Sequence, residues 1–405
     1  MPGGKLLDPG GLAIGTTQTD IQSEPAVASA GVGSLVVWAH RTGQANAIYA
    51  TRLSPTGAGL APAEVPLAEA AYPDRYLRSP AAAFDGRNYL VAWTESERYG
   101  APHVVGVRLT PDGTVLDGAK IPIVSGQTPA VAFDGTNYLV VAREYAFDPY
   151  GSTNLLLATR VTPSGTVLDT TPIVVASSLG YDPTPAVAFN GTNYLVVWLT
   201  RDRTGFVITI GGARVARNGT VLDPSGLVIA RPVTGSDQPT VASDGAGYLV
   251  AWEDARFGCC SVYGTRVGAA GNVLDPAGIA IATRGREQLR PASAFDGTNY
   301  LVAWQDNRSS TTDVYGARVT RSGRLLDPRG ILLSTELPPP ARCIVPRVTG
   351  LRLGRARARL RRAHCSKGRV RKARSKRVGR VLAQSPRPGS VRRAGYPVRL
   401  VVGRR

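Results

Sequence analysis

Residues 291–304 read PASAFDGTNYLVAW, and this stretch decides the fold. Two short runs, PASAF and YLVAW, flank the tetrapeptide DGTN at residues 296–299. An Asp-Gly pair between β-branched and aromatic runs is a strong signal for a β-hairpin. The stretch therefore predicts two antiparallel strands joined by a tight turn.

The same stretch occurs six times along the chain. Its copies begin at Pro25, Pro80, Pro129, Pro185, Pro239 and Pro291, at intervals of 55, 49, 56, 54 and 52 residues. All five tryptophans of the protein lie thirteen residues after one of these prolines, and only the third copy has alanine, Ala142, at that place. A fixed period with one aromatic residue per unit predicts a stack of equivalent modules.

Each unit contains two further strand candidates. One is VYGARV at residues 314–319, which alternates large and small residues, and the other is GILLS at residues 330–334. Four antiparallel strands in about 50 residues are typical of a β-propeller blade. A solenoid would lack the two hairpins per unit, and a sandwich gives no reason for a repeat. We therefore predict an all-β propeller over residues 1–335.

The chain begins part-way through a unit. Residues 1–8 align with residues 162–169, which form the turn before a fourth strand. We expect a six- or seven-bladed β-propeller of six full repeats plus an N-terminal remnant strand, so that the first blade is truncated. On this hypothesis the full gene encodes one more blade and a signal peptide upstream of Met1.

The periodic aromatic residues have two interpretations. An exposed row of tryptophans would be a platform for sugars, whereas buried ones would pack between neighbouring blades. Because a ligand site differs from blade to blade and these positions do not, we expect packing. A second periodic pair is an arginine followed nine residues later by aspartate, as in Arg266 and Asp275, and we interpret it as a recurring ion pair or turn lock.

Acidic and basic residues also cluster just after the tryptophans. These loops leave the second strand of each unit and should share one face of the ring. We select them as candidate ligand-binding loops: Asp202, Arg203, Asp254, Arg256, Asp306 and Arg308. The competing interpretation is a local Asp–Arg pair in a solvated turn. We identify no catalytic residue, but a carbohydrate-active site, sialidase-like or glycan lyase-like, remains the alternative function for the ring.

The positive charge of the protein is confined to its C-terminal part. Residues 341–405 contain 22 of the 48 Lys and Arg and none of the 29 Asp and Glu, although the whole chain has a net charge of +19. The chain has no apolar run of about 18 residues, so no membrane span is expected. Three histidines and four cysteines at unrelated places give no metal-ligand pattern, and we expect neither a metal nor a cofactor.

After the stiff Pro-rich linker at residues 336–342, the tail resembles a PASTA domain. The matching motifs are VPRVTG at residues 345–350, GRVLAQSPRPG at residues 379–389 and GYPVRLVV at residues 395–402. Independently of the family, the segment is predicted to form a strand, a helix and two strands. We therefore expect a small, basic α+β PASTA-like domain over residues 343–405.

The resemblance implies a partner in the bacterial cell wall, because PASTA domains are associated with peptidoglycan fragments. The arginines Arg352, Arg355, Arg359 and Arg362 on the predicted helix suit phosphate or carboxylate groups, so we select them as polyanion-binding residues. Nucleic acid is a third possible partner, but the tail has a single aromatic residue, Tyr396, for base stacking. Cys343 and Cys365 bracket the first strand and helix, and a disulfide between them would place the protein outside the cytoplasm.

The leading functional prediction is a non-catalytic binding protein, extracellular or associated with the cell wall. Its tail would dock on peptidoglycan or an anionic wall polymer, and its ring would present a binding face to a glycan or a protein. The ligand of the ring is not visible in the repeat itself.

Overall fold

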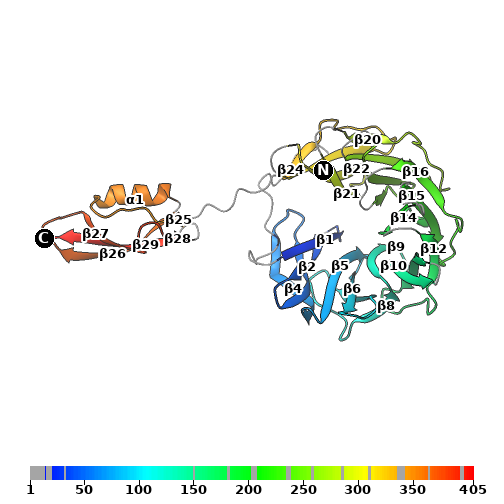
Figure 1. Ribbon diagram of the computed structural model, residues 1–405, viewed down its shortest axis with the longest axis horizontal. Coiled ribbons are helices and arrows are strands. Elements are labelled where there is room, and N and C mark those ends of the chain that lie inside the picture. The colour runs from blue at the N-terminus through cyan, green and yellow to red at the C-terminus, as the bar shows by residue number, and fades with distance from the viewer. Residues whose placement is uncertain are drawn as a thin grey trace. The chain divides into compact units, whose positions relative to one another are not determined.

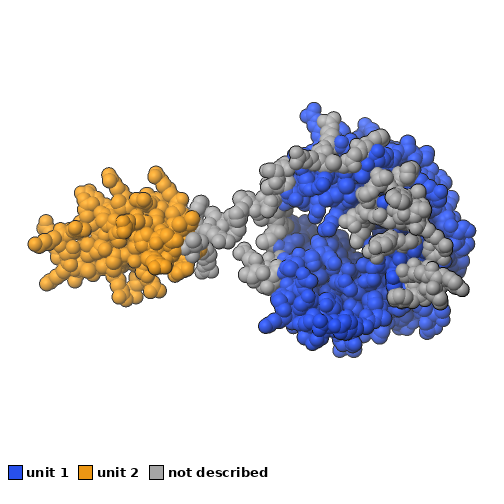
Figure 2. Space-filling model, in the orientation of Figure 1, with its two compact units in different colours: residues 1–335 blue, residues 336–405 orange. Residues whose placement is uncertain are grey.

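The computed structural model (Figure 1) has two compact units, residues 1–335 and residues 336–405 (Figure 2). It describes residues 14, 21–31, 33–148, 151–179, 183–201, 208–233, 239–256, 260–283, 287–308, 312–334, 343–363, 365–392 and 396–405. The Pro-rich linker and, apart from Ile14, the expected N-terminal remnant strand lie outside these ranges.

Unit 1 is a β-propeller (Figure 1). Its described residues form six antiparallel sheets of four strands, here called blades 1 to 6, and in each sheet the strands follow one another in chain order. The first strands of successive blades lie side by side around the centre, from β1 through β5, β9, β13 and β17 to β21. The four-stranded repeat predicted from the sequence is confirmed.

The strands have the following bounds. Blades 1 and 2 contain β1 (Ile21–Ser29), β2 (Ser34–Arg41), β3 (Ala45–Leu53), β4 (Gly59–Ala71), β5 (Arg75–Phe84), β6 (Tyr89–Glu97), β7 (His103–Leu109) and β8 (Ile121–Ser125). Blades 3 and 4 contain β9 (Gln127–Phe133), β10 (Tyr138–Asp148), β11 (Gly151–Val161), β12 (Ile173–Leu179), β13 (Ala186–Phe189), β14 (Asn193–Arg201), β15 (Ile208–Ala216) and β16 (Leu227–Val233). Blades 5 and 6 contain β17 (Thr240–Ser243), β18 (Tyr248–Asp254), β19 (Ser261–Val267), β20 (Ile279–Ala282), β21 (Gln288–Phe295), β22 (Asn299–Asp306), β23 (Asp313–Thr320) and β24 (Ile331–Ser334).

In blades 2 to 6 the first hairpin is closed by a DGTN-like turn. In blade 3 the Asp134 Oδ1 atom accepts hydrogen bonds from the backbone N–H groups of Thr136 and Asn137, both at 2.7 Å. Gly135 has φ of +91°, a left-handed conformation that glycine adopts without steric cost. The turn motif thus supplies both the backbone freedom and the side-chain acceptor that a tight hairpin needs.

In blades 1 to 5 the second strand is buried on both faces. In β10, Tyr138 and Val140 pack against residues of blade 2, whereas Leu139 and Val141 pack against residues of blade 4. All four side chains have no exposed surface. Because side chains alternate between the faces of a strand, the motif YLVVW covers two neighbouring blades at once. The core of unit 1 is therefore a series of layers between blades.

The tryptophans belong to these layers. Trp93, Trp198, Trp252 and Trp304 each pack in a cluster with the preceding blade. The fifth tryptophan, Trp38, is 5% exposed, and the other four are less exposed than that. The packing interpretation is thus confirmed for the four clustered residues, and none of the five is available as a sugar platform.

Two polar contacts join the blades as well. The hydroxyl of Tyr194 donates to the carbonyl of Asn137 in the hairpin of the preceding blade, at 2.9 Å. On the third strand, the Arg266 Nη2 atom lies 2.8 Å from Asp275 Oδ1, and its Nη1 atom donates to the carbonyl of Arg321 in the next blade at 3.2 Å. The predicted ion pair is confirmed, and in blades 2 to 5 its arginine also bonds to the next blade; we call it the Arg–Asp lock. It recurs in the pairs Arg108–Asp117, Arg160–Asp169, Arg214–Asp223 and Arg318–Asp327.

Unit 2 is a small α+β domain. Its elements are β25 (Cys343–Ile344), α1 (Leu353–Arg362), β26 (Ser366–Arg374), β27 (Val381–Ser385), β28 (Val391–Arg392) and β29 (Pro397–Arg404). The sheet has the order β26-β29-β27, with β26 and β29 parallel, and β25 pairs with β28. The predicted strand–helix–strand–strand order is incomplete. It lacks β26 and the two-residue strand β28; β26 is rich in exposed Arg and Lys, and its Val370 packs against the core of the domain.

The core of unit 2 is small and contains a disulfide. Ala356 and Leu360 of α1 are buried against the sheet residues Val398 and Leu400. The expected bond between Cys343 and Cys365 is present, and both cysteines are buried. It closes a loop whose ends are 22 residues apart. No described helix is long and apolar enough to cross a membrane.

The Arg–Asp lock makes the ring sensitive to acid. The hydrogen bond from Arg266 lowers the pKa of Asp275. The ion pair therefore contributes its full stability above the ordinary Asp pKa of about 4. This contribution is lost as the pH falls through the lowered pKa of Asp275. We expect Asp275→Asn to lower the free energy of unfolding at pH 7 by about 2 kcal/mol and to flatten its acid dependence. Urea unfolding between pH 7 and pH 2 measures both effects.

The exposed Asp74 provides a matched control for that substitution. Asp74→Asn should unfold as the wild type does at every pH. Parallel pH profiles for wild type and Asp275→Asn would contradict a charged lock.

The disulfide is expected to decide whether unit 2 is folded. Replacing both Cys343 and Cys365 by serine removes a constraint worth about 3 kcal/mol in the chain-entropy estimate. A domain with so small a core has a total stability of about the same size. We expect the near-ultraviolet and NMR signals of unit 2 to lose their dispersion while the ring keeps its unfolding midpoint. An unchanged NMR spectrum of unit 2 in the double variant would contradict this expectation.

Candidate functional site

The loops selected from the sequence turn out to be internally bonded. Asp254 has no exposed surface, and its carboxylate accepts hydrogen bonds from Trp252 Nε1 at 3.0 Å and from Arg256 Nε at 2.9 Å. The guanidinium of Arg256 lies 4.6 Å from the centre of the Tyr263 ring, a cation–π contact. Both charges of this loop are thus engaged within blade 5.

Blade 6 repeats the arrangement. The buried Asp306 accepts hydrogen bonds from Trp304 Nε1 at 2.9 Å and from Arg308 Nη2 at 2.6 Å, and the Arg308 guanidinium lies 3.8 Å from the centre of the Tyr315 ring. Burial alone would raise the pKa of Asp306, but the hydrogen bonds from Arg308 and Trp304 hold it below its ordinary value. Asp306 is therefore ionised at neutral pH and paired.

These contacts support the competing interpretation of a local Asp–Arg pair. In blades 5 and 6 the pair holds the indole of the tryptophan, while the Nε1 atoms of Trp93 and Trp198 have no hydrogen-bond partner in the described part of the chain. The third selected pair, Asp202 and Arg203, lies outside the described residues.

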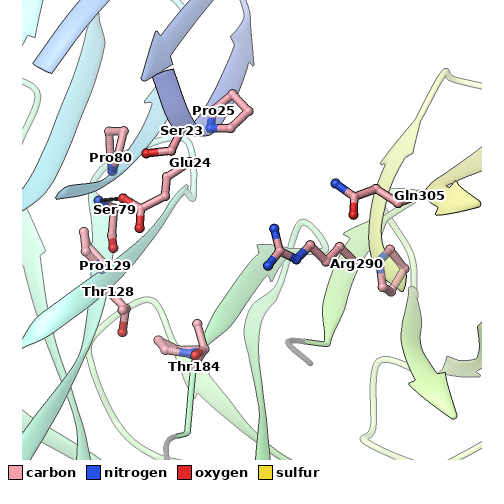
Figure 3. A pocket seen from close by; sticks show the side chains of 12 residues that line it. Ser23, Glu24, Pro25, Ser79, Pro80, Thr128, Pro129, Thr184, Arg290 and Gln305 are labelled. Carbon is pink, nitrogen blue, oxygen red and sulfur yellow. Dashed lines mark hydrogen bonds between the residues drawn. The ribbon is translucent and has the colours of Figure 1, made fainter. Parts of the chain in front are cut away.

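A cavity of about 680 Å³ lies at the centre of the ring (Figure 3). Its polar lining comes chiefly from the residue before each repeat proline, with Ser23 and Gln305 in addition. The residues concerned are Glu24, Ser79, Thr128, Thr184 and Arg290. This position, unlike the tryptophan position, changes its chemistry from blade to blade, as expected of a ligand site.

The local backbone explains why these side chains face the cavity. The pairing of the first and second strands shifts register around the proline, for example between Leu289 and Ala292, which is a β-bulge. At the bulge, Glu24, Ser79, Thr128 and Arg290 have φ between +52° and +54°. Residues other than glycine rarely adopt this conformation, which costs on the order of 1–3 kcal/mol and is concentrated at functional sites.

Hydrogen bonds between blades support the bulges. The backbone N–H of Ser79 donates to Glu24 Oε2 of the preceding blade at 2.6 Å. The backbone N–H of Thr128 donates in the same way to Thr94 Oγ1 at 2.9 Å. The cavity wall is thus held in place by contacts that cross from blade to blade, which limits its rearrangement on ligand binding.

The sequence analysis did not select this cavity, although a signal for it exists. The prolines are constant, and the residue before them varies among Glu, Ser, Thr, Gln and Arg. The cavity and the selected loops lie at the same end of the blades, because Leu289 beside the bulge pairs with Gln305, next to the loop that follows β22. The choice of face was therefore close to the cavity, but the four chosen residues that the structure describes, Asp254, Arg256, Asp306 and Arg308, do not line it.

The tail arginines form an exposed basic surface. Arg355, Arg359 and Arg362 are spaced four and three residues apart on α1, so they share one face, and all three are exposed. Arg352 is also exposed and is the residue that precedes the helix. Other arginines of α1 and β26, not selected from the sequence, are exposed as well: Arg357, Arg361, Arg369, Arg371 and Arg374.

Part of the sequence is similar to a known protein family. Residues 344–404 match the PASTA domain family, as the resemblance of the tail implied. No curated protein matches the chain.

Solved structures with similar folds share little sequence with it. Pyrococcus horikoshii acylaminoacyl peptidase has a TM-score of 0.43 and 11% identity, over 74% of this chain and 45% of that one, so the chain spans less than half of the peptidase. An α-L-arabinofuranosidase from Lactobacillus brevis has a TM-score of 0.37 and 11% identity, covering 61% and 92% of the two chains. A GH43_1 enzyme from Xanthomonas citri complexed with xylose has the same score and identity, covering 76% and 91%. Likenesses at this level carry no information about activity.

The buried position of Asp306 leads to a testable expectation. Asp306→Asn leaves the partly exposed Arg308 guanidinium without its ionised partner, and losing hydrogen bonds to a charged group costs about 2 kcal/mol. We expect a loss of that size in urea unfolding. Glu97→Gln serves as the control, because the Glu97 side chain, at the end of β6 in blade 2, is 70% exposed. Equal stability of both variants would show that Asp306 is not a structural residue.

Proposed function

We propose that the protein is a non-catalytic binding protein of the bacterial cell surface. Its PASTA domain docks on peptidoglycan or an anionic wall polymer, and its ring binds a ligand at the end that carries the central cavity. The observation that carries the proposal is the match of residues 344–404 to the PASTA domain family, in a unit with a disulfide and an exposed basic surface.

The disulfide supports a location outside the cytoplasm. Structural disulfides persist in oxidising compartments and are rare where glutathione keeps thiols reduced. The bond between Cys343 and Cys365 is buried in the centre of the small core, so it is part of the folded domain. A wall-associated or secreted protein is consistent with both the family and the bond.

The charge of unit 2 supports an anionic partner. Residues 341–405 carry 22 basic residues and no acidic one, and those on α1 are exposed. Guanidinium groups bind phosphate and carboxylate through paired hydrogen bonds, and both groups occur in wall polymers. Nucleic acid offers phosphates too, but Tyr396 is the tail's one aromatic residue, which gives little for bases to stack on.

The ring supports binding rather than catalysis by the loops first considered. Asp254 and Asp306, the carboxylates that a carbohydrate-active enzyme would use there, are buried and each holds an arginine and a tryptophan. The central cavity instead offers polar side chains that differ between blades, on a backbone held in an unfavourable conformation.

Sedimentation of the full-length protein with purified peptidoglycan, over a salt titration, tests the docking. We expect retention that survives about 0.2 M salt, because specific contacts outlast the loss of bare charge attraction. Replacing Arg355, Arg359 and Arg362 by glutamine should weaken the affinity about tenfold, since each exposed pair contributes up to ~1 kcal/mol.

A charge-matched control separates position from net charge. Glutamine at the exposed ring residues Arg87, Arg324 and Arg329 removes the same charge and should leave retention unchanged. Release of the wild type below about 0.2 M salt, or equal losses in the two triple variants, would contradict docking through this helix face.

A further inference from the structure

We infer that the central cavity of the ring binds a carboxylated saccharide. Arg290 would hold the carboxylate, and the hydroxyl-bearing residues around the rest of the wall would hold the hydroxyls of the sugar. If the ring is a binding module, as proposed above, its ligand has to match walls of this chemistry.

One side of the cavity is cationic and amide-bearing. Arg290 of β21 and Gln305 of β22 both project into the cavity from this side (Figure 3). A guanidinium is always protonated in proteins, and its planar set of N–H donors matches the two oxygens of a carboxylate. The Gln305 amide adds donors and an acceptor beside it.

The opposite part of the wall carries hydroxyls and one carboxylate. Ser79, Thr128 and Thr184 lie there together with Glu24 (Figure 3). A hydroxyl both donates and accepts hydrogen bonds, and the Glu24 carboxylate accepts them, so this side suits a ligand with several hydroxyl groups. Glu24 would also repel an anionic group, which directs the ligand's carboxylate towards Arg290.

The repeat prolines add an apolar component to the wall. The rings of Pro25, Pro80, Pro129, Pro185 and Pro291 line the cavity between the polar side chains. Such rings suit the C–H faces of a sugar, and a cavity of about 680 Å³ is of the size that holds a small ligand. An anionic group, many hydroxyls and apolar ring faces together describe an acidic sugar.

The strained backbone at the bulges indicates that these side chains have a functional role. Glycine would adopt the positive φ of the bulge without strain, yet Glu24, Ser79, Thr128 and Arg290 hold it with full side chains. Each such residue is destabilising on its own, and observed strain of this kind points to function. The ring also positions one of these side chains, since the Ser79 N–H donates a hydrogen bond to Glu24 Oε2 at 2.6 Å.

Isothermal titration of the full-length protein with D-glucuronate, D-glucose and N-acetylmuramate tests the assignment. Glucuronate and glucose share one ring and differ in the carboxylate, whereas N-acetylmuramate carries its carboxylate on an ether substituent. We expect at least one of the two acids to bind, and glucose to bind at least tenfold more weakly. The acid that binds distinguishes a uronic acid from a wall sugar.

Variants locate the site. Arg290→Gln should weaken binding of the acid at least tenfold, and Ser79→Ala should weaken it severalfold. Arg87→Gln, in an exposed hairpin turn that does not line the cavity, should bind as the wild type does. Thermal unfolding of each variant confirms that it is folded.

The outcomes are separable from those of wall docking. If neither acid binds the wild type, or if folded Arg290→Gln binds the acid unchanged, the ligand assignment is wrong. The same preparations are tested for sedimentation with peptidoglycan, which depends on unit 2. A protein that sediments but binds no acid contradicts only the ligand, whereas one that binds the acid but does not sediment contradicts only the docking.

Discussion

The burial of the second strand on both of its faces is the constraint on which the ring depends. Tyr138 and Val140 pack against blade 2 while Leu139 and Val141 pack against blade 4, so no blade has a core of its own. Hydrophobic side chains leave water only when a neighbouring blade is in place, and stability is therefore cooperative along the ring. The layers between blades also explain why the chain needs one large aromatic residue in nearly every unit.

The packing of each blade against its neighbours explains why some positions of the repeat are nearly constant and others vary. The tryptophans and the Arg–Asp lock each recur in five of the six units because they stabilise contacts between neighbouring blades, and the hairpin turns recur because they join the first two strands of a blade. Where blade 3 lacks its tryptophan, Ala142 pairs with Leu157 of the adjoining strand, and both are buried in the same layer. The residue before each proline is not fixed by a contact that every blade repeats, since the described side chains at this position line the cavity and only Glu24 among them also accepts a hydrogen bond from a neighbouring blade, from the Ser79 N–H. Variation is therefore compatible with the fold at this position.

Much of the fold could be predicted from the sequence because its determinants are local. A period near 50 residues, alternation along YLVVW and an Asp-Gly turn require only neighbouring residues to be recognised. In the tail, the PASTA motifs and the two cysteines were sufficient to predict the domain family and the disulfide. The charged residues after the tryptophans look like an exposed site in sequence, whereas in space Asp306 is buried and paired with the partly exposed Arg308. Strand β26 was missed because five of its nine residues are exposed Arg or Lys.

The sequence by itself determined the module, its number of complete copies among the described residues, and the separation of a basic tail from a nearly neutral ring. Only the tertiary structure decided which polar residues meet. Glu24, Ser79, Thr128 and Arg290 lie on four different blades, far apart along the chain, and the ring brings them around one cavity. Their convergence follows from arranging repeated sheets around a centre, where the bulges in the first strands of blades 1, 2, 3 and 6 lie at the cavity. No local pattern of residues contains that geometry.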